Sequence, residues 1–578
     1  MTFDTSCVVC GAPGGKQCAR CRQVSYCGKE HQRQHWKAGH REKCRCYKIS
    51  RNTALGRHLT ATRPIRKGEI IFIDSPLLLG PKIASVPVCL GCHRNLPTTS
   101  IDAHFDFYHC RRCGWPMCDS SCEAALDHRE ECALLARTPK SIRSEIHFRP
   151  DDPHRKESLY CVIVPLRALL LKRSNPQRFR DVFLSLESHL EARIKTPLYA
   201  ALRSNLVPFV RDFLGMGKEA TEHELLQIAA ILDTNCYEVR LPDRNVKVRA
   251  LYELGSMMSH DCRPNTKHYF DERLRLLVVA TVDIPEDATI SISYTQPLLS
   301  TIQRRYAIKQ AKCFECCCDR CQDPTELFTY AGSIVCPLCH RAKLTAFDPL
   351  DMRSDWHCEN RKCPFRESAC DAVRRNEQLQ ATMMALARAD SPREEYERFL
   401  TTHQQPSTGL LHPWNTNVLQ VKYALTQLYR QPGAKDEKAI VSQPEAQLRR
   451  QIELCRDLLK VADHLEPGFS PFRGKLLVEL RDALLILRDQ KHQDLSQWSA
   501  TASQEHVHPA MSTAITKSKQ RQRRQRRGKI DTEAIGNSGE GGGQTTKQLL
   551  QDVEAELAEM RKSDPTLDKF YDDGGLRY

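Results

Sequence analysis

The 578-residue sequence lacks several features that would assign it to a common class of protein. It has no run of about 18 apolar residues, the length that a membrane-spanning helix needs. The N-terminal stretch MTFDTSCVVCG has neither a basic start nor an apolar core, so we expect no secretory signal there. Aromatic residues make up only 7%, against 40% hydrophobic and 27% charged residues. This composition is typical of a soluble globular chain, and the length predicts about three to four domains.

Acidic residues are absent from one short stretch, and this makes the charge uneven. The net charge is +15, from 86 basic and 71 acidic residues. Eight of the excess charges lie within residues 517–529, at Lys517, Lys519, Arg521, Arg523, Arg524, Arg526, Arg527 and Lys529. The chain as a whole is therefore not expected to be a nucleic-acid binder. The basic run indicates a nuclear localisation signal, a patch for nucleic acid or an acidic partner, or a solvated linker.

Cysteine, by contrast, is abundant, with 28 residues. Because thiols stay reduced in the cytosol and nucleus, we expect metal sites or buried thiols rather than disulfides. The first group is four ligand pairs: Cys7 and Cys10, Cys18 and Cys21, Cys27 and His31, His40 and Cys44. A second group repeats the pattern: Cys89 and Cys92, Cys110 and Cys113, Cys118 and Cys122, His128 and Cys132. Since zinc takes thiolate and imidazole from such pairs, each group predicts two structural zinc sites.

Two more cysteine groups follow residue 310. One is a C-x-C-x2-C core, which leaves one tetrahedral position for a ligand from elsewhere, and it consists of Cys316, Cys318 and Cys321. The other has the spacing of a zinc ribbon, with four unpaired thiols as the alternative, and it consists of Cys336, Cys339, Cys358 and Cys363. We therefore expect about six zinc ions.

Apolar patterning separates a strand-rich part from helical parts. Residues 69–79, 274–284 and 289–294 have strand patterns, whereas residues 158–233 and 371–490 have helical ones. Residues 491–545 are rich in Ser, Thr, Gln and Gly and are expected to be disordered. Beyond them, one apolar face predicts a small docking helix, formed by Leu549, Val553, Leu557 and Met560.

The N-terminal cysteine pattern, in which Tyr26 and Trp36 stand between the ligand positions, resembles a MYND zinc finger. That resemblance implies a two-zinc domain that binds short peptides, often proline-rich. It implies interleaved sites, one with Cys7, Cys10, Cys27 and His31 and the other with Cys18, Cys21, His40 and Cys44. The second group resembles a divergent MYND-like finger, and the same logic implies one site of Cys89, Cys92, Cys118 and Cys122 and another of Cys110, Cys113, His128 and Cys132.

Three further motifs resemble those of SET domains. They are Gly56-Arg57-His58 with Lys67-Gly68-Glu69, the segment 259–265 (SHDCRPN), and Ile290 to Tyr294 followed by the cysteines at 313–321. Together with the fingers they resemble the SET-and-MYND protein lysine methyltransferases, in particular their arthropod branch. This implies an α+β multidomain chain with zinc-finger MYND units, a β-rich SET domain split by a MYND-like insert, a post-SET zinc site, an α-helical C-terminal domain and a disordered basic tail.

The resemblance also implies roles for single residues. S-adenosylmethionine (S-adenosyl-L-methionine) would be bound by Gly56, Arg57, His58, Asn235, Ser259, His260, Tyr294 and Phe314, with the first three in a loop against it. Tyr294 would be catalytic, at the channel for the target lysine. Cys262 would complete the zinc site of Cys316, Cys318 and Cys321.

Several positions depart from the family pattern. Ser259 replaces the usual Asn, Asp261 the usual Ser, Asp287 a common Gly, and Lys312 a second channel tyrosine. Two functions therefore stay open. One is a methyltransferase acting on histone or other protein lysines, with MYND-mediated interaction and a role in transcriptional repression. The other is a weak or inactive SET scaffold that acts as a zinc-finger adaptor or corepressor.

The predicted domains are a MYND finger (1–46), a SET domain (47–312) with a zinc insert (89–132), a post-SET motif (313–322), a zinc-ribbon-like segment (323–370), a helical domain (371–490) and a basic tail with a short terminal helix (491–578). We expect lysine-bearing protein substrates, proline-rich peptide partners, no membrane association, a monomer, and a location in the nucleus and cytoplasm.

Overall fold

The computed structural model describes residues 6–13, 15–18, 24–41, 44–83, 87–96, 108–138, 159–241, 246–404, 409–430, 443–504 and 545–563. The predicted ligand Cys21 and the basic run 517–529 lie outside these ranges. The chain divides into two compact units, the first with residues 1–296 and 303–318, and the second with residues 297–302 and 319–563. Among the described residues, no helix combines the length and apolar character needed to cross a bilayer.

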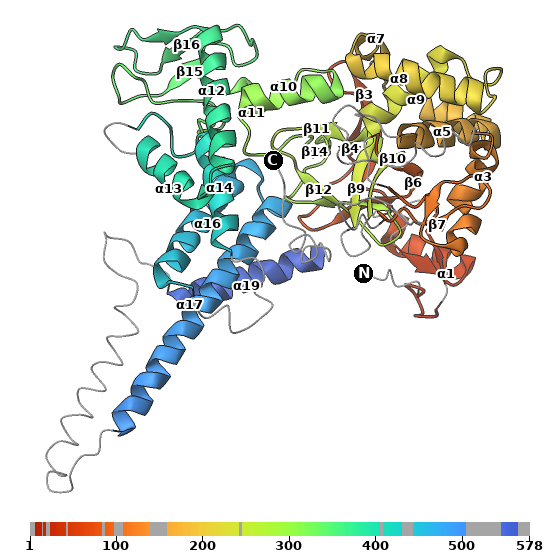
Figure 1. Cartoon of the computed structure of the whole chain (residues 1–578). Helices are drawn as coiled ribbons and strands as arrows, with labels where there is room; N and C mark the ends of the chain where they lie inside the picture. Colours follow the sequence, from red (N-terminus) through yellow and green to blue (C-terminus); the bar gives the residue numbers. More distant parts are fainter. Residues whose placement is uncertain are drawn as a thin grey trace, which may run out of the picture. The chain divides into compact units, whose positions relative to one another are not determined.

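Short strands make up the β-rich part of the first unit (Figure 1). Two three-stranded antiparallel sheets have the strand orders β6-β10-β9 and β12-β13-β5. Their strands are β5 (Ile70–Asp74), β6 (Pro76–Gly80), β9 (Tyr237–Leu241), β10 (Val246–Tyr252), β12 (Thr266–Phe270) and β13 (Leu276–Ala280). Every residue of β13, the central strand of its sheet, is buried. The predicted strand segments 69–79 and 274–284 thus contain β5, most of β6 and β13.

Four smaller pairings complete the strands of this unit. Three are antiparallel: β1 (Lys16–Gln17) with β2 (Ser25–Tyr26), β3 (Tyr47–Asn52) with β4 (Gly56–Ala61), and β7 (Tyr108–His109) with β8 (Pro116–Met117). The fourth is parallel, and joins β11 (Ser259–His260) to β14 (Ser291–Ile292). This parallel pair brings two of the predicted SET motifs side by side.

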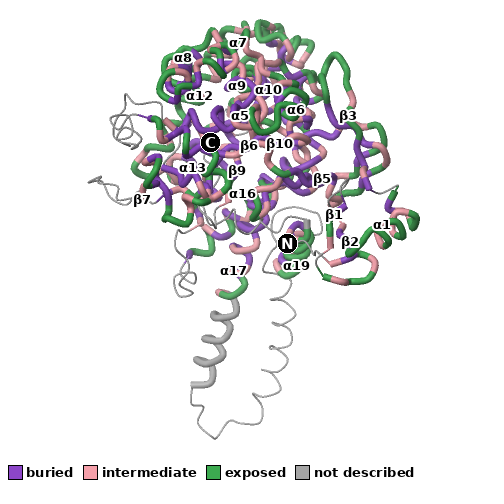
Figure 2. Tube along the Cα trace, turned by 90° about the vertical axis from the view of Figure 1, so that its right-hand side faces the viewer, coloured by how far each residue is buried: buried purple, intermediate pink, exposed green. Residues whose placement is uncertain are grey.

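The α-helices of the first unit share its apolar core with the strands and connecting segments. They are α1 (Lys29–His35), α3 (Leu126–Leu135), α5 (Ile163–Ser174), α6 (Pro176–Arg178), α7 (Leu190–Arg193), α8 (Pro197–Pro208), α9 (Glu222–Asn235) and α10 (Thr301–Lys312). The side chain of Thr221 caps α9 by accepting from the Glu224 amide at 3.1 Å, as expected of Thr followed three residues later by Glu. Apolar side chains of α9, β6 and β10 belong to one buried cluster, and much of this region is purple in Figure 2.

The second unit joins a small sheet to a helical bundle. Strands β15 (Leu344–Ala346), β16 (Trp356–Cys358) and β17 (Arg366–Glu367) form an antiparallel sheet. The helices are α11 (Asp319–Gln322), α12 (Ala369–Ala387), α13 (Pro392–His403), α14 (Thr416–Tyr429), α16 (Glu445–Leu465), α17 (Pro471–Gln504) and α19 (Thr546–Ser563). The expected helical character of 371–490 is therefore confirmed, although α17 continues past residue 490, where a disordered tail was predicted.

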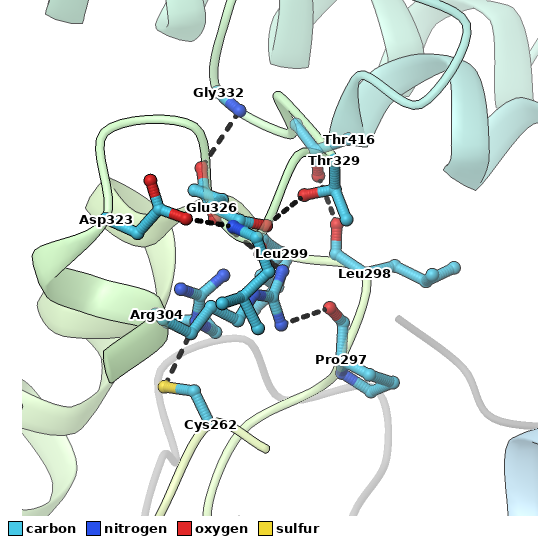
Figure 3. A network of polar contacts seen from close by, with 12 residues as sticks. Cys262, Pro297, Leu298, Leu299, Arg304, Asp323, Glu326, Thr329, Gly332 and Thr416 are labelled. Atoms are coloured by element: carbon cyan, nitrogen blue, oxygen red, sulfur yellow. Dashed lines mark hydrogen bonds and ion pairs between the residues drawn. The ribbon is translucent and has the colours of Figure 1, made fainter. Parts of the chain in front are cut away.

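Buried polar contacts join the two segments at the start of the second unit, residues 297–302 and the segment that begins at residue 319. Arg320 is fully buried and donates to the carbonyls of Pro297 and Leu299 at 2.8 and 3.1 Å. It also pairs with Glu326, which accepts from the amide of Gly332 (Figure 3). Such a buried charge is tolerated because it is paired and hydrogen-bonded.

The expected docking helix exists as α19, with its apolar face shifted by one residue at its start. The buried side chains are Leu550, Val553, Leu557 and Met560, whereas Leu549 is only half-buried. This face packs against α17.

Candidate functional site

In the described part of the chain, five of the ligand groups predicted from the sequence converge, each with its ligand atoms within 4.8 Å of one another. They are Cys7, Cys10, Cys27 and His31; Cys89, Cys92, Cys118 and Cys122; Cys110, Cys113, His128 and Cys132; Cys262, Cys316, Cys318 and Cys321; and Cys336, Cys339, Cys358 and Cys363. These are the groupings expected from the sequence. Zn–S bonds of about 2.3 Å in a tetrahedron separate two sulfurs by about 3.8 Å. The Sγ pairs Cys10–Cys27, Cys336–Cys363 and Cys339–Cys358 lie 3.6, 3.7 and 3.7 Å apart, so these donors fit zinc.

The second predicted site of the N-terminal finger is only partly described. Cys18 and Cys44 have their sulfurs 3.6 Å apart, and His40 is buried. Cys21, the fourth expected ligand, lies outside the described residues. Cys18, Tyr26 and Cys44 form a small core of their own, with Trp36 packed against it.

The insert holds two groups in one compact element. Cys92 and Cys118 have their sulfurs 3.4 Å apart, and His128 places Nε2 at 3.4 Å from Cys110 and 3.6 Å from Cys113. His128 therefore faces its group through Nε2. Gly91 is needed between the first two cysteines, because a Cβ there would lie 2.5 Å from the carbonyl oxygen of Cys122.

A buried arginine ties this insert to the core. Arg167 of α5 uses all five of its N–H donors. Two go to the Glu131 carboxylate at 2.8 and 2.7 Å, two to the carbonyls of Leu79 and Leu90 at 2.6 and 3.1 Å, and one to His93 Nε2 at 2.8 Å. Leu90 and His93 are sequence neighbours of Cys89 and Cys92, which belong to one ligand group of the insert. Glu131 lies between His128 and Cys132, which belong to the other.

Glu131 also lies beside the Nδ1 side of the His128 ring, opposite the nitrogen that faces the cysteines. His128 and Glu131 are both fully buried, and His128 Nδ1 lies 3.8 Å from a Glu131 oxygen. Among the described residues His128 Nδ1 has no hydrogen-bond partner. A carboxylate behind a zinc-bound imidazole orients the ring and fixes its tautomer. Glu131 is placed to do this for His128.

The predicted SET site centres on His260 and Tyr294. His260 Nδ1 accepts from the backbone amide of Tyr294 at 3.0 Å, and burial lowers the pKa of His260 to about 4. A neutral imidazole that accepts at Nδ1 carries its proton on Nε2. That nitrogen lies 3.3 Å from Cys262 Sγ, which Arg304 Nε also approaches at 3.2 Å (Figure 3). His260 thus joins Tyr294 to the cysteine group.

Three rings of this region gather into an aromatic cluster. His260 and Tyr294 have ring centroids 5.1 Å apart, and Phe314 lies 6.2 and 6.4 Å from them. Tyr294 as a residue is 38% exposed, yet its hydroxyl donates to the Met258 carbonyl at 2.5 Å. Burial around this phenol raises its pKa to about 12, so the hydroxyl stays protonated at neutral pH.

Other predicted cofactor residues lie around these rings, with one correction. Gly56, Arg57 and His58 were expected in a loop, but they begin strand β4, because they pair with Asn52, Arg51 and Ser50 of β3. The turn before them requires φ of +64° at Gly56, which glycine adopts without strain. His58 is buried with Nδ1 3.1 Å from the Gly56 carbonyl, and Arg57 donates to the carbonyl of Ser185.

Asn235 and Ser259 lie at the ends of two elements of the same unit. Asn235, the last residue of α9, donates through Nδ2 to the carbonyls of Glu187 and Ile231 at 2.8 and 2.7 Å. Its carbonyl oxygen is therefore the part of the amide best suited to accept from a ligand. Ser259 pairs with Ser291 in the parallel strand pair, which fixes its backbone beside His260.

Two residues beside Tyr294 had no role assigned from the sequence. Tyr237 follows Asn235 by two residues and donates to the Gly255 carbonyl at 2.7 Å. Its pKa is raised well above the usual value, first by burial and then by the nearby Tyr294 phenol. Lys312, noted only as a departure, places Nζ 5.3 Å from the centroid of the Tyr294 ring. The signal that could have found Tyr237 is its spacing from Asn235.

Comparison with known proteins agrees with this geometry. The MYND finger model matches residues 7–44, and the SET domain model matches residues 56–295. The chain therefore carries a MYND finger and a SET domain, and the predicted resemblance to the SET-and-MYND methyltransferases is confirmed.

Individual relatives point the same way. SET domain-containing protein SmydA-8, isoform A, of Drosophila melanogaster is 29% identical over 320 residues, which cover 54% of this chain and 63% of that protein. Histone-lysine N-methyltransferase SMYD3 of Homo sapiens is 24% identical over 283 residues, which cover 46% of this chain and 59% of that protein. The match thus spans less than two thirds of each relative.

One solved structure, the SET domain of LSMT bound to lysine and AdoHcy, shares 11% identity. It covers 84% of this chain and 98% of that one at a TM-score of 0.23, a value too low to support an argument.

Proposed function

We propose that this chain is an S-adenosylmethionine-dependent protein-lysine N-methyltransferase, acting on a histone or another protein. The observation that carries the proposal is the His260–Tyr294–Phe314 cluster, which His260 Nε2 links to Cys262. Two of its three rings, His260 and Tyr294, lie within the residues that match the SET domain. The donor sets of the cysteine groups support about six zinc ions. The relatives named histone-lysine methyltransferases support the reaction class.

When bound, S-adenosylmethionine supplies an activated methyl group, so the protein's task is to position an amine and exclude water. Phe314 and His260 offer faces for the flat part of the cofactor, and the Asn235 carbonyl oxygen can accept from its amino groups. Tyr294 forms a wall of the lysine site, with a protonated hydroxyl held on the Met258 carbonyl. A target lysine must arrive as the neutral amine, whose formation burial favours.

The proposal is tested with full-length, zinc-loaded protein, radiolabelled S-adenosylmethionine and core histones. Tyr294→Phe removes the bond to Met258 and is expected to abolish most transfer while the protein still binds the cofactor. Tyr306→Phe is the matched control, because the Tyr306 side chain is 62% exposed on α10. Equal activity of the Tyr294→Phe and Tyr306→Phe variants would overturn the assigned role of Tyr294.

A second candidate function is an adaptor or corepressor that binds proline-rich peptides through the N-terminal finger. The separate small core of Cys18, Tyr26 and Cys44, with Trp36 against it, favours an independent peptide-binding element. Trp36→Ala is expected to abolish capture of a proline-rich peptide, whereas Tyr294→Phe leaves it unchanged. Methyl transfer that persists in Trp36→Ala would show that the two functions are separable.

The remaining features stand as parts of the same proposal. We propose as well the domain boundaries given above, a role in repression, a monomeric state, a zinc ribbon at 323–370 and a location in nucleus and cytoplasm. The basic run at 517–529 is proposed as the nuclear signal or acidic-partner patch, and deleting it should move the protein to the cytoplasm.

A further inference from the structure

Lys312 is the last residue of α10 and turns its amine toward the proposed active site. Its Nζ donates to the carbonyl of Thr234 at 2.6 Å and lies 5.3 Å from the centroid of the Tyr294 ring. Thr234 precedes Asn235, and Lys312 is two residues before Phe314. The amine is therefore surrounded by residues proposed to bind the cofactor or the target lysine.

These surroundings supply what a methyl-accepting lysine needs. An aromatic face attracts an amine or ammonium, and a carbonyl oxygen takes one N–H and fixes the direction of the nitrogen. Burial lowers the pKa of Lys312, which favours the neutral, nucleophilic amine. The charged and titratable groups that face it are Cys236 and Asp233, which raise its pKa, and Arg193, which lowers it.

A neighbouring lysine shows how selective this placement is. Lys309 lies one turn earlier on α10, and its side chain is 62% exposed. It pairs with Glu315 at 2.6 Å rather than with the aromatic cluster. Of these two lysines on α10, only Lys312 reaches Tyr294.

We propose that Lys312 is itself a methyl acceptor of this SET domain, so that the chain modifies its own active site. The inference rests on the proposed methyltransferase function. In the transfer, the lone pair of the neutral Lys312 amine forms an N–CH3 bond as the S–CH3 bond of S-adenosylmethionine breaks. S-adenosylhomocysteine leaves with the electron pair of the broken bond, and the nitrogen then loses one proton to solvent.

The test uses full-length, zinc-loaded protein with labelled S-adenosylmethionine and no other substrate. Mass spectrometry of the proteolysed chain should find the label on Lys312. The label should be lost in Lys312→Arg and kept in Lys309→Arg. Because S-adenosylmethionine would be bound by the same chain that carries Lys312, the methylation is expected to occur within one molecule. Its first-order rate constant should therefore not change with protein concentration.

A second readout does not depend on turnover. S-adenosylhomocysteine should slow the reaction of Lys312 with an amine-acylating reagent and leave the rate at Lys309 unchanged. Failure of this protection, although calorimetry shows the ligand bound, would overturn the placement of Lys312 beside the cofactor.

The outcomes separate this inference from the proposed function. If calorimetry shows S-adenosylmethionine bound and histones become labelled while Lys312 does not, the inference is wrong and the function stands. If zinc-loaded protein binds no S-adenosylmethionine, the proposed function fails and the inference fails with it.

Discussion

Replacing Arg167 by methionine should unfold the first unit at much lower denaturant concentration than in the wild-type protein. The substitution keeps an unbranched apolar stem but removes the guanidinium with all five of its hydrogen bonds. It leaves the Glu131 carboxylate fully buried without its counter-charge.

The expected cost can be worked out from these contacts. Breaking one side of a buried ion pair costs about 3–5 kcal/mol, and each carbonyl left without a donor adds about 1 kcal/mol. Since domains are stable by only about 5–15 kcal/mol, a loss of roughly 5 kcal/mol removes much of the available stability. Urea unfolding is followed by far-UV circular dichroism, and zinc release is measured in parallel. Both the unfolding and the zinc release should occur at lower urea concentration in Arg167→Met than in the wild-type protein.

Arg173→Met serves as the matched control. Arg173 also lies on α5, but its pair with Glu219 is 3.9 Å long and both side chains are more than half exposed. Such a pair contributes about 0–1 kcal/mol. If Arg167→Met unfolded and released zinc no earlier than Arg173→Met, the argument that Arg167 joins the insert to the core would be refuted.

Two further predictions concern acid stability and zinc content. Burial lowers the pKa of His268 to about 4, so the unfolded chain takes up the proton first, and stability present above pH 6.5 is lost as pH falls toward 4. His268→Gln should reduce that loss by about 3 kcal/mol, and identical pH profiles would contradict it. Cys336→Ser should lower the zinc content, measured by elemental mass spectrometry, by one ion per chain. Cys370→Ser, at an exposed cysteine of α12, should not, and equal content in both variants would argue against the ribbon site.

The metal ligands could be predicted from the sequence because paired cysteines and histidines stand only a few residues apart. A pair such as Cys336 and Cys339 indicates a turn that holds two thiols close together. Which two pairs share one zinc ion was taken from the resemblance to MYND fingers. The structure groups Cys7 and Cys10 with Cys27 and His31 in this interleaved way. The strand and helix segments were likewise visible in their apolar periodicity.

Long-range contacts were not visible in the same way. Arg167 interrupts an apolar helix, which hints at a buried charge, but its partners lie 36 to 88 residues away in sequence. Nothing local indicates that Lys312 turns toward Tyr294, since that depends on how α10 packs near the end of α9. The strand at Gly56 to His58 was missed for another reason: a loop was carried over from the family resemblance, whereas these residues form a local hairpin with β3, in which Gly56 pairs with Asn52.

The most direct test of the methyltransferase proposal is a calorimetric titration of zinc-loaded, full-length protein with S-adenosylmethionine. The proposal predicts saturable binding of one molecule per chain, weakened when His260 is replaced by alanine. No binding by protein that carries its full zinc content would contradict it, and would favour the adaptor function of the N-terminal finger.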